Sequence, residues 1–147
     1  MPELPGSVLF ACSHNAIRSP MAEAILRFLH GRKIYVQSVG VRPAEVDPFA
    51  VAVLDEIGID LSRHRSRSFD ELDDDYFDLV VSLSPEAQHK AVELTRTSHC
   101  EIEFWHMPDP SIIEGSREVK LEAYRTLRDM LMRRIRERFP LEGAPQV

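Results

Sequence analysis

The sequence predicts an α/β fold, a single domain in which an open parallel sheet carries helices on both faces. Short apolar runs typical of strands, at residues 8–11, 34–36, 78–83 and 101–105, alternate with longer segments whose apolar residues recur at helical spacing. No repeat, linker or low-complexity segment interrupts this alternation. Strands that alternate with helices are joined by right-handed crossovers, which make the sheet parallel. The 147 residues suffice for one domain with one core, and we expect flexible tails at residues 1–5 and 141–147.

The first half of the chain contains two strands and two helices. Residues 8–11 are too apolar for a half-exposed strand and predict a central strand covered on both faces. A helix begins at Ser19, an expected N-cap followed by Pro20, and stops at Gly31. Residues 34–36 form the second strand and residues 38–43 a loop. Pro48 then opens a helix that runs through Ile57.

The second half repeats the pattern. Residues 78–83 predict a third buried strand, and Ser84 is the expected N-cap of the helix that follows. The alternating residues 101–105 predict an edge strand. Residues 115–139 form one long helix. Its expected inward residues are Val119, Ala123, Leu127, Met130, Leu131 and Ile135.

Composition narrows the possible partners. No apolar stretch is long enough to cross a membrane, and the first residues lack the basic-then-apolar profile of a signal peptide, so we expect a cytoplasmic protein with no membrane partner. The formal net charge of −6 argues against nucleic-acid binding. Only Cys12 and Cys100 supply thiols, so no disulfide framework is indicated. We expect no metal site and no cofactor, and nothing in the sequence fixes the oligomeric state.

The chemistry centres on Cys12 and Arg18, six positions apart where the first strand meets the first helix. The residues between them are Ser13, His14, Asn15, Ala16 and Ile17. If these residues curl into a ring, their N–H groups and the Arg18 guanidinium face one point, where a substrate oxyanion fits. Such donors and the positive end of the helix favour the Cys12 thiolate, which is the nucleophile of a cysteine phosphatase. Alternatively, a cysteine that closes a buried strand is simply a small apolar residue.

The stretch from Cys12 through Arg18-Ser19-Pro20 to Ala22-Glu23 resembles the phosphate-binding loop of the low-molecular-weight protein tyrosine phosphatases and their arsenate reductase relatives. A second family mark, an Asp-Pro pair late in the chain, stands here as Asp109-Pro110. The resemblance covers nearly the whole chain and implies the strand order 2-1-3-4. Ligands of such sheets bind at the carboxyl ends of the strands, where both motifs are expected.

The resemblance also suggests roles for several side chains. Asp109 is expected to protonate the leaving oxygen and then to activate water, although an Asp-Pro pair is also a common turn initiator. Ser19 is expected to cap the helix and to donate its hydroxyl toward the Cys12 sulfur. Asn15 suits a left-handed backbone and a locking side chain, and the family match implies that Ser38 braces the loop. His64 matches a family histidine that supports the loop, yet residues 62–68 also suit a solvated basic segment.

Three departures from the family pattern bear on specificity. His14 stands where the tyrosine phosphatases usually carry glycine, so either a side chain projects near the mouth or the loop takes another path. Ile17 replaces a second cysteine that can protect the nucleophile from oxidation. Ser111 and Ile112 replace aromatic residues that pack on a phosphotyrosine ring. A preference for phosphotyrosine therefore does not follow from the resemblance.

Three functions are compatible with these residues. The first is hydrolysis of a phosphomonoester, in a phosphorylated protein or a small molecule, through a phosphocysteine intermediate. The second is arsenate reduction with an external small thiol, because Cys100 is expected far from the catalytic edge. The third is a non-enzymatic phosphate- or flavin-binding module. The first explains Cys12, Arg18 and Asp109 together and is the leading hypothesis from the sequence.

Overall fold

The computed structural model describes residues 4–72, 76–96 and 99–141. Strands and helices alternate throughout, as expected. The elements are β1 (Ser7–Cys12), α1 (Arg18–His30), β2 (Tyr35–Gly40), α2 (Pro48–Asp55), η1 (Phe69–Glu71), β3 (Leu79–Ser82), α3 (Pro85–Leu94), β4 (Glu101–Phe104), η2 (Pro110–Ile112) and α4 (Arg117–Arg138). The expectation of flexible tails falls mostly on residues 1–3 and 142–147, which lie outside the described part.

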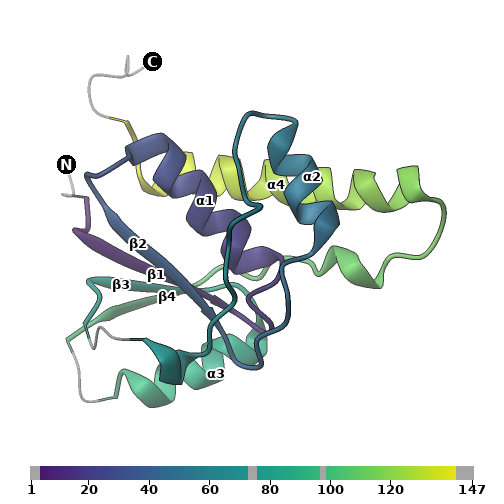
Figure 1. The fold of residues 1–147 in the computed structure, drawn as a ribbon. Helices are drawn as coiled ribbons and strands as arrows, with labels where there is room; N and C mark the ends of the chain where they lie inside the picture. The colour runs from purple at the N-terminus through teal and green to yellow at the C-terminus, as the bar shows by residue number, and fades with distance from the viewer. Residues whose placement is uncertain (1–3, 73–75, 97–98, 142–147) are drawn as a thin grey trace.

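The four strands form one parallel sheet in the order β2-β1-β3-β4, as the resemblance implied. Figure 1 shows α1, α2 and α4 on one side of this sheet and α3 on the other. Alternation along β1 explains the two layers, because successive side chains point to opposite faces. Val8, Phe10 and Cys12 belong to the core beneath α1 and α4, whereas Leu9 and Ala11 belong to the core beneath α3.

The carboxyl ends of the strands meet at one edge of the sheet. Cys12 pairs with Gly40 at the end of β2, and Ala11 pairs with Ser82 at the end of β3. The second strand is longer than expected: it runs to Gly40, whereas the sequence indicated a loop from residue 38. Continued pairing with β1 extends it, and Ser38 and Val39 are fully buried there. The same edge therefore carries Cys12 and Ser38 on neighbouring strands.

Side-chain caps start three of the α-helices. Asp47 accepts a hydrogen bond from the Phe49 N–H at the start of α2, and Ser116 accepts one from Val119 at the start of α4. Ser84 caps α3 as expected, through the Ala87 N–H. These caps satisfy backbone donors that lack partners in the first helical turn.

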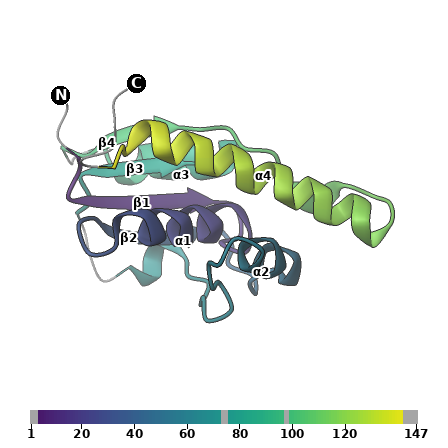
Figure 2. The same cartoon turned by 90° about the horizontal axis from the view of Figure 1, so that it is seen from above.

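The inward face of α4 is rotated from the expected one. Leu127, Leu131 and Ile135 are fully buried as expected, but Val119 and Met130 are 50% and 40% exposed. The residues that instead turn inward near the start of the helix are Leu121 and Tyr124. Figure 2 shows the reason: the N-terminal part of α4 extends beyond the strands, so its neighbours there are not the sheet. Tyr124 instead donates a hydrogen bond to Asp47 at the start of α2, over 2.9 Å.

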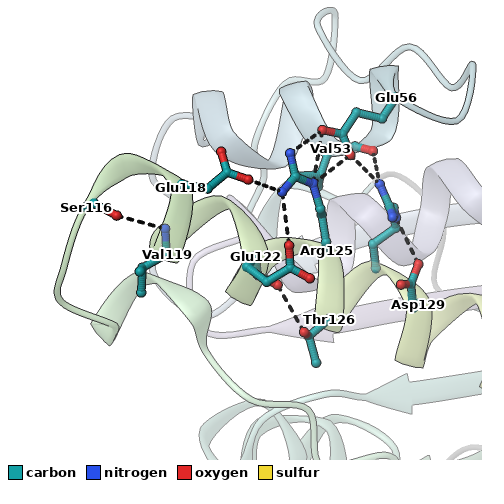
Figure 3. A network of polar contacts seen from close by, with 10 residues as sticks. Val53, Glu56, Ser116, Glu118, Val119, Glu122, Arg125, Thr126 and Asp129 are labelled. Atoms are coloured by element: carbon teal, nitrogen blue, oxygen red, sulfur yellow. Dashed lines mark hydrogen bonds and ion pairs between the residues drawn. The ribbon is translucent and has the colours of Figure 1, made fainter.

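An ion network joins α2 to α4 (Figure 3). Arg125 contacts Glu56 at 2.8 Å, Glu118 at 2.8 Å and Glu122 at 3.1 Å, and Arg128 also reaches Glu56 at 2.8 Å. The two guanidinium groups hold the pKa of the Glu56 carboxyl at about 2. Glu56 follows the last residue of α2, so this network fixes the end of α2 against α4.

An aromatic group closes the core where β4 ends. Trp105 is 2% exposed and meets the Phe10 ring edge-on, with centroids 6.0 Å apart. The Phe139 ring lies 6.3 Å away, and the Arg134 guanidinium from α4 lies 5.1 Å above the indole. This group therefore links α4 to β1 and β4.

Within residues 4–72, 76–96 and 99–141, none of the helices combines the length and the apolar character that a membrane span requires.

Candidate active site

The loop between β1 and α1 turns its carbonyl oxygens outward. All five carbonyls of residues 12–16 accept hydrogen bonds from segments outside the loop. The donors, in order, are Val41 N (3.1 Å), Arg42 N (2.8 Å), Ala44 N (2.9 Å), Ser66 Oγ (2.8 Å) and Asp47 N (3.0 Å). Because the C=O and the next N–H of a trans peptide point in opposite directions, the N–H groups of residues 13–17 face the other way, toward the interior of the ring. The loop therefore offers a cup of amides suited to an oxyanion.

Cys12 lies beneath this cup. The thiol is 2% exposed, and its sulfur lies 3.0 Å from the Ser19 hydroxyl oxygen and 3.4 Å from the Ser19 nitrogen, which donates to it. Ser19 does not cap α1, contrary to expectation. The helix already begins at Arg18, its N-cap position is Ile17, and no side chain caps it there. The Ser19 hydroxyl is thus available to the sulfur and to the Val39 carbonyl, 3.2 Å away.

Asn15 ties the loop to its surroundings. Its φ of 51° is left-handed, as its residue type suggests, and its side chain is fully buried. The amide nitrogen donates to Ser19 Oγ at 2.8 Å and to Ser38 Oγ at 2.9 Å. The amide oxygen accepts from the Arg67 N–H at 2.9 Å and contacts His64 Nε2 at 3.0 Å. All four hydrogen-bonding positions of the side-chain amide are therefore occupied.

Glu23 also belongs to this network, although no role was predicted for it from the sequence. It is 6% exposed although charged, it accepts a short hydrogen bond from Ser38, and it pairs with Arg27 one helical turn later. His64 Nδ1 lies 3.8 Å from it. Burial lowers the pKa of His64, and the nearby Glu23 carboxylate opposes that shift. In its neutral form, His64 carries its proton on Nε2 and donates it to the side-chain oxygen of Asn15. The oxygen is the acceptor because the side-chain nitrogen of Asn15 already donates to two serines. The sequence does contain a sign of the Glu23–Arg27 ion pair, because residues four apart in a helix lie next to each other on its surface.

Gly40 makes the close approach of β2 to the loop possible. A Cβ at this position would lie 2.5 Å from Asn15 N and 2.6 Å from the His14 carbonyl carbon. Both are backbone atoms that cannot move without opening the ring. Any side chain at position 40 would therefore displace the loop, a constraint that the sequence alone did not reveal.

Arg18 and Asp109 lie at the rim of the amide cup; Arg18 is the first residue of α1, and Asp109 directly precedes η2. Arg18 is 8% exposed and donates from Nη1 to the Met107 carbonyl at 3.2 Å, which links α1 to the segment after β4. Asp109 caps the short helix η2: its Oδ1 accepts from Ser111 N at 2.9 Å and from Ser111 Oγ at 2.6 Å. The turn-initiating role considered for Asp109 is thus present. Both of these hydrogen bonds use Oδ1, and Asp109 also lines the pocket described next.

A small pocket brings these groups together. Its lining residues are Cys12, His14, Ala16, Ile17, Arg18, Asp109 and Ser111. His14 is exposed at the mouth, as expected from its place in the loop. No Phe, Tyr or Trp is among the lining residues, and Ile112, which follows Ser111, is 73% exposed rather than part of the wall. Ser13 turns away to donate to Ser84 Oγ at 3.1 Å. The pocket thus matches a tetrahedral oxyanion better than an aromatic ring.

Cys100 lies at the opposite edge of the sheet. It directly precedes β4, whereas Cys12 ends β1, and the two strands run in the same direction. Burial raises the pKa of the Cys100 thiol, helped by nearby Asp78 and Glu101. The second thiol is therefore remote from the pocket and is kept protonated.

Comparison with known proteins agrees with this geometry. A family model for low molecular weight phosphotyrosine protein phosphatase matches residues 7–139. The chain belongs to this family. Among curated members of related sequence, the glutaredoxin arsenate reductase of Synechocystis sp. is 33% identical over 128 residues, covering 87% of this chain and 92% of that protein.

Solved relatives include both activities of the family. An arsenate reductase in its phosphate-binding state is 31% identical, with a TM-score of 0.71 over 89% of this chain and 94% of the other. A low-molecular-weight protein tyrosine phosphatase from T. tengcongensis is 30% identical, with a TM-score of 0.73 over 88% and 94%. Membership in this phosphatase family therefore leaves two reactions to distinguish.

Proposed function

We propose that this enzyme reduces arsenate, with Cys12 as nucleophile and an external thiol as reductant. The small pocket, whose lining contains no Phe, Tyr or Trp, carries this proposal, because it suits a bare oxyanion. Curated relatives named arsenate reductases, such as that of Bacillus subtilis, which is 32% identical over 133 residues, support the same choice. The sequence alone ranked phosphomonoester hydrolysis first, and these two observations reverse that order.

The loop positions the arsenic for attack. The amides of residues 13–17 and the Arg18 guanidinium bind three arsenate oxygens, and the Cys12 thiolate approaches from below. A sulfur–arsenic bond forms as the arsenate hydroxyl leaves, and Asp109 gives that hydroxyl a proton so that it departs as water. The Ser19 N–H donates to the Cys12 sulfur and lowers the basicity of the nucleophile, and the Ser19 hydroxyl adds to this effect when its single proton turns from the Val39 carbonyl to the sulfur.

Reduction then requires two external thiols. The first attacks the Cys12 sulfur, forming a mixed disulfide, and the sulfur–arsenic electron pair stays on arsenic, which leaves as arsenite. The second thiol attacks the mixed disulfide and releases the Cys12 thiolate. Arsenic gains two electrons, and the two external thiols lose two as they become one disulfide. Cys100, at the far edge of the sheet, takes no part.

Phosphomonoester hydrolysis is the second candidate, and Asp109 is the observation that favours it. An acid beside the pocket can protonate a leaving alkoxide and then deprotonate the water that hydrolyses a phosphocysteine. This reaction consumes no electrons and needs no second thiol. It uses Cys12, Arg18 and the loop amides in the same way.

The two reactions are separated by assaying one reduced preparation for both products. Arsenite formation is followed with glutathione and glutaredoxin, or with a mycothiol system, against turnover of p-nitrophenyl phosphate. We expect arsenite formation that depends on the external thiol, that Cys12→Ser abolishes and that Cys100→Ser leaves unchanged. Loss of arsenite formation in Cys100→Ser would contradict the external-thiol mechanism. Phosphatase turnover without arsenite formation would assign the second candidate.

A further inference from the structure

A second cavity lies behind the oxyanion loop, between α1 and residues 60–67. Its volume is about 400 Å³, within the range of small-molecule sites. Four arginines and a histidine line it together with two carboxylates. The charged and titratable lining residues are Glu23, Arg27, Asp60, Arg63, His64, Arg65 and Arg67, and the others are Pro20, Ala24 and Leu61. We call this cavity the basic groove.

The two carboxylates of the basic groove are already engaged. Glu23 is paired with Arg27 and Ser38, as described above. Asp60 accepts from Ser62 N at 2.9 Å and Ser62 Oγ at 2.6 Å, and these hydrogen bonds lower its pKa. Both carboxylates are thereby committed to local contacts.

Three of the arginines form no close ion pair among the described residues, although the charge of Arg63 interacts with the Asp60 carboxylate at longer range. No side-chain hydrogen bond or ion pair joins Arg63, Arg65 or Arg67 to any residue in the described part of the chain. Arg63 and Arg65 are exposed, and Arg67 is partly buried. In a chain of net charge −6, three guanidinium groups around one cavity, none of them in a close ion pair with a described residue, form a local positive potential.

We propose that the basic groove binds a small polyanion that carries two or more phosphate or carboxylate groups. Guanidinium groups bind such oxyanions in pairs of parallel hydrogen bonds, and several of them around one cavity select for multiple charges. This proposal goes beyond arsenate reduction and does not require it. The groove is separate from the catalytic pocket, since the two share no lining residue.

The groove is connected to the catalytic loop through Asn15. The segment that carries the arginines bonds to this residue three times: Arg67 N and His64 Nε2 contact its side-chain oxygen, and Ser66 Oγ donates to its carbonyl. The Arg67 carbonyl also accepts from Gly40 N at 2.8 Å. A ligand that draws the arginines together therefore acts on backbone that holds the oxyanion ring. The groove is thus an effector site whose occupancy is sensed at Asn15.

Binding is tested with inorganic tripolyphosphate and isotope-labelled Cys12→Ser protein, which carries out neither proposed reaction. Heteronuclear NMR follows the backbone of residues 60–67, the arginine Nε–H groups and the Asn15 side-chain amide. The test variant is Arg63→Gln/Arg65→Gln, and the matched control is Arg133→Gln/Arg136→Gln, which removes the same charge from exposed positions on α4. Neither pair includes a residue of the catalytic pocket.

We expect tripolyphosphate to shift the resonances of residues 60–67 and of Asn15. Losing two charge-assisted contacts should weaken binding about tenfold or more in the groove variant, while the α4 control stays within about twofold of the parent. Equal weakening in both variants would show only general attraction to positive charge and would overturn the proposal. Shifts confined to residues 12–18 would overturn it as well. Because the parent is inactive, neither result depends on which reaction the enzyme catalyses.

Discussion

Replacing Asn15 tests whether its side-chain amide holds the oxyanion ring together. In Asn15→Ala, the Arg67 N–H and the His64 ring lose their acceptor, whereas Ser19 and Ser38 keep other partners. Two part-buried donors without partners cost about 2–4 kcal/mol, and alanine at a φ of 51° adds about 1 kcal/mol. We therefore expect a loss of about 3–5 kcal/mol.

The backbone contribution is separated by a second variant. Asn15→Gly loses the same hydrogen bonds but adopts positive φ freely, so it should be about 1 kcal/mol more stable than Asn15→Ala. Urea unfolding followed by circular dichroism gives both values, and thermal melts should fall by roughly 10 °C for the alanine variant. Stability within about 0.5 kcal/mol of wild type in both variants would refute the assigned network. Equal stability of the two variants would refute the backbone contribution.

Three further changes probe the acid, the ion network and the core. Asp109→Asn should slow arsenite formation about a hundredfold or more, because the departing oxygen loses its proton donor; an unchanged rate would exclude that role. Glu56→Gln should lower the melting temperature at pH 7. The deficit should shrink between pH 4.5 and 2, because the lowered pKa of Glu56 stabilises the fold only while the carboxylate is ionised; a constant deficit would contradict this. Leu127→Ala should cost about 2–5 kcal/mol in urea unfolding, and a loss below about 1 kcal/mol would mean that its site is not packed as described.

The sequence predicted the sheet because its signals are local. Apolar runs of strand length and a cap such as Ser84 act within a few residues of one another, so reading the chain in order recovers them. The end of β2 was wrong because Ser38 and Gly40 carry no strand signal of their own; pairing with β1 extends the strand. The inward face of α4 was wrong near Val119 because the partner of a helix changes along its length, which periodicity does not encode.

The candidate site shows the same division between local and distant contacts. Cys12 and Arg18 were found from their spacing, since one short loop holds both. Ser19 was misassigned as a cap because a serine before proline suits that position, whereas the Cys12 sulfur and Asn15 take its hydroxyl. Glu23 and Gly40 matter only through contacts with segments distant in the chain, which one sequence cannot reveal.

The buried position of Trp105 makes its intrinsic fluorescence a reporter of folding. It is the single tryptophan of the chain, and its indole is shielded by Phe10, Phe139 and the Arg134 guanidinium. Departure of α4 would bring water to the indole and move its fluorescence emission to longer wavelength. Unfolding of the region around α4 can thus be followed in the unlabelled protein from one chromophore.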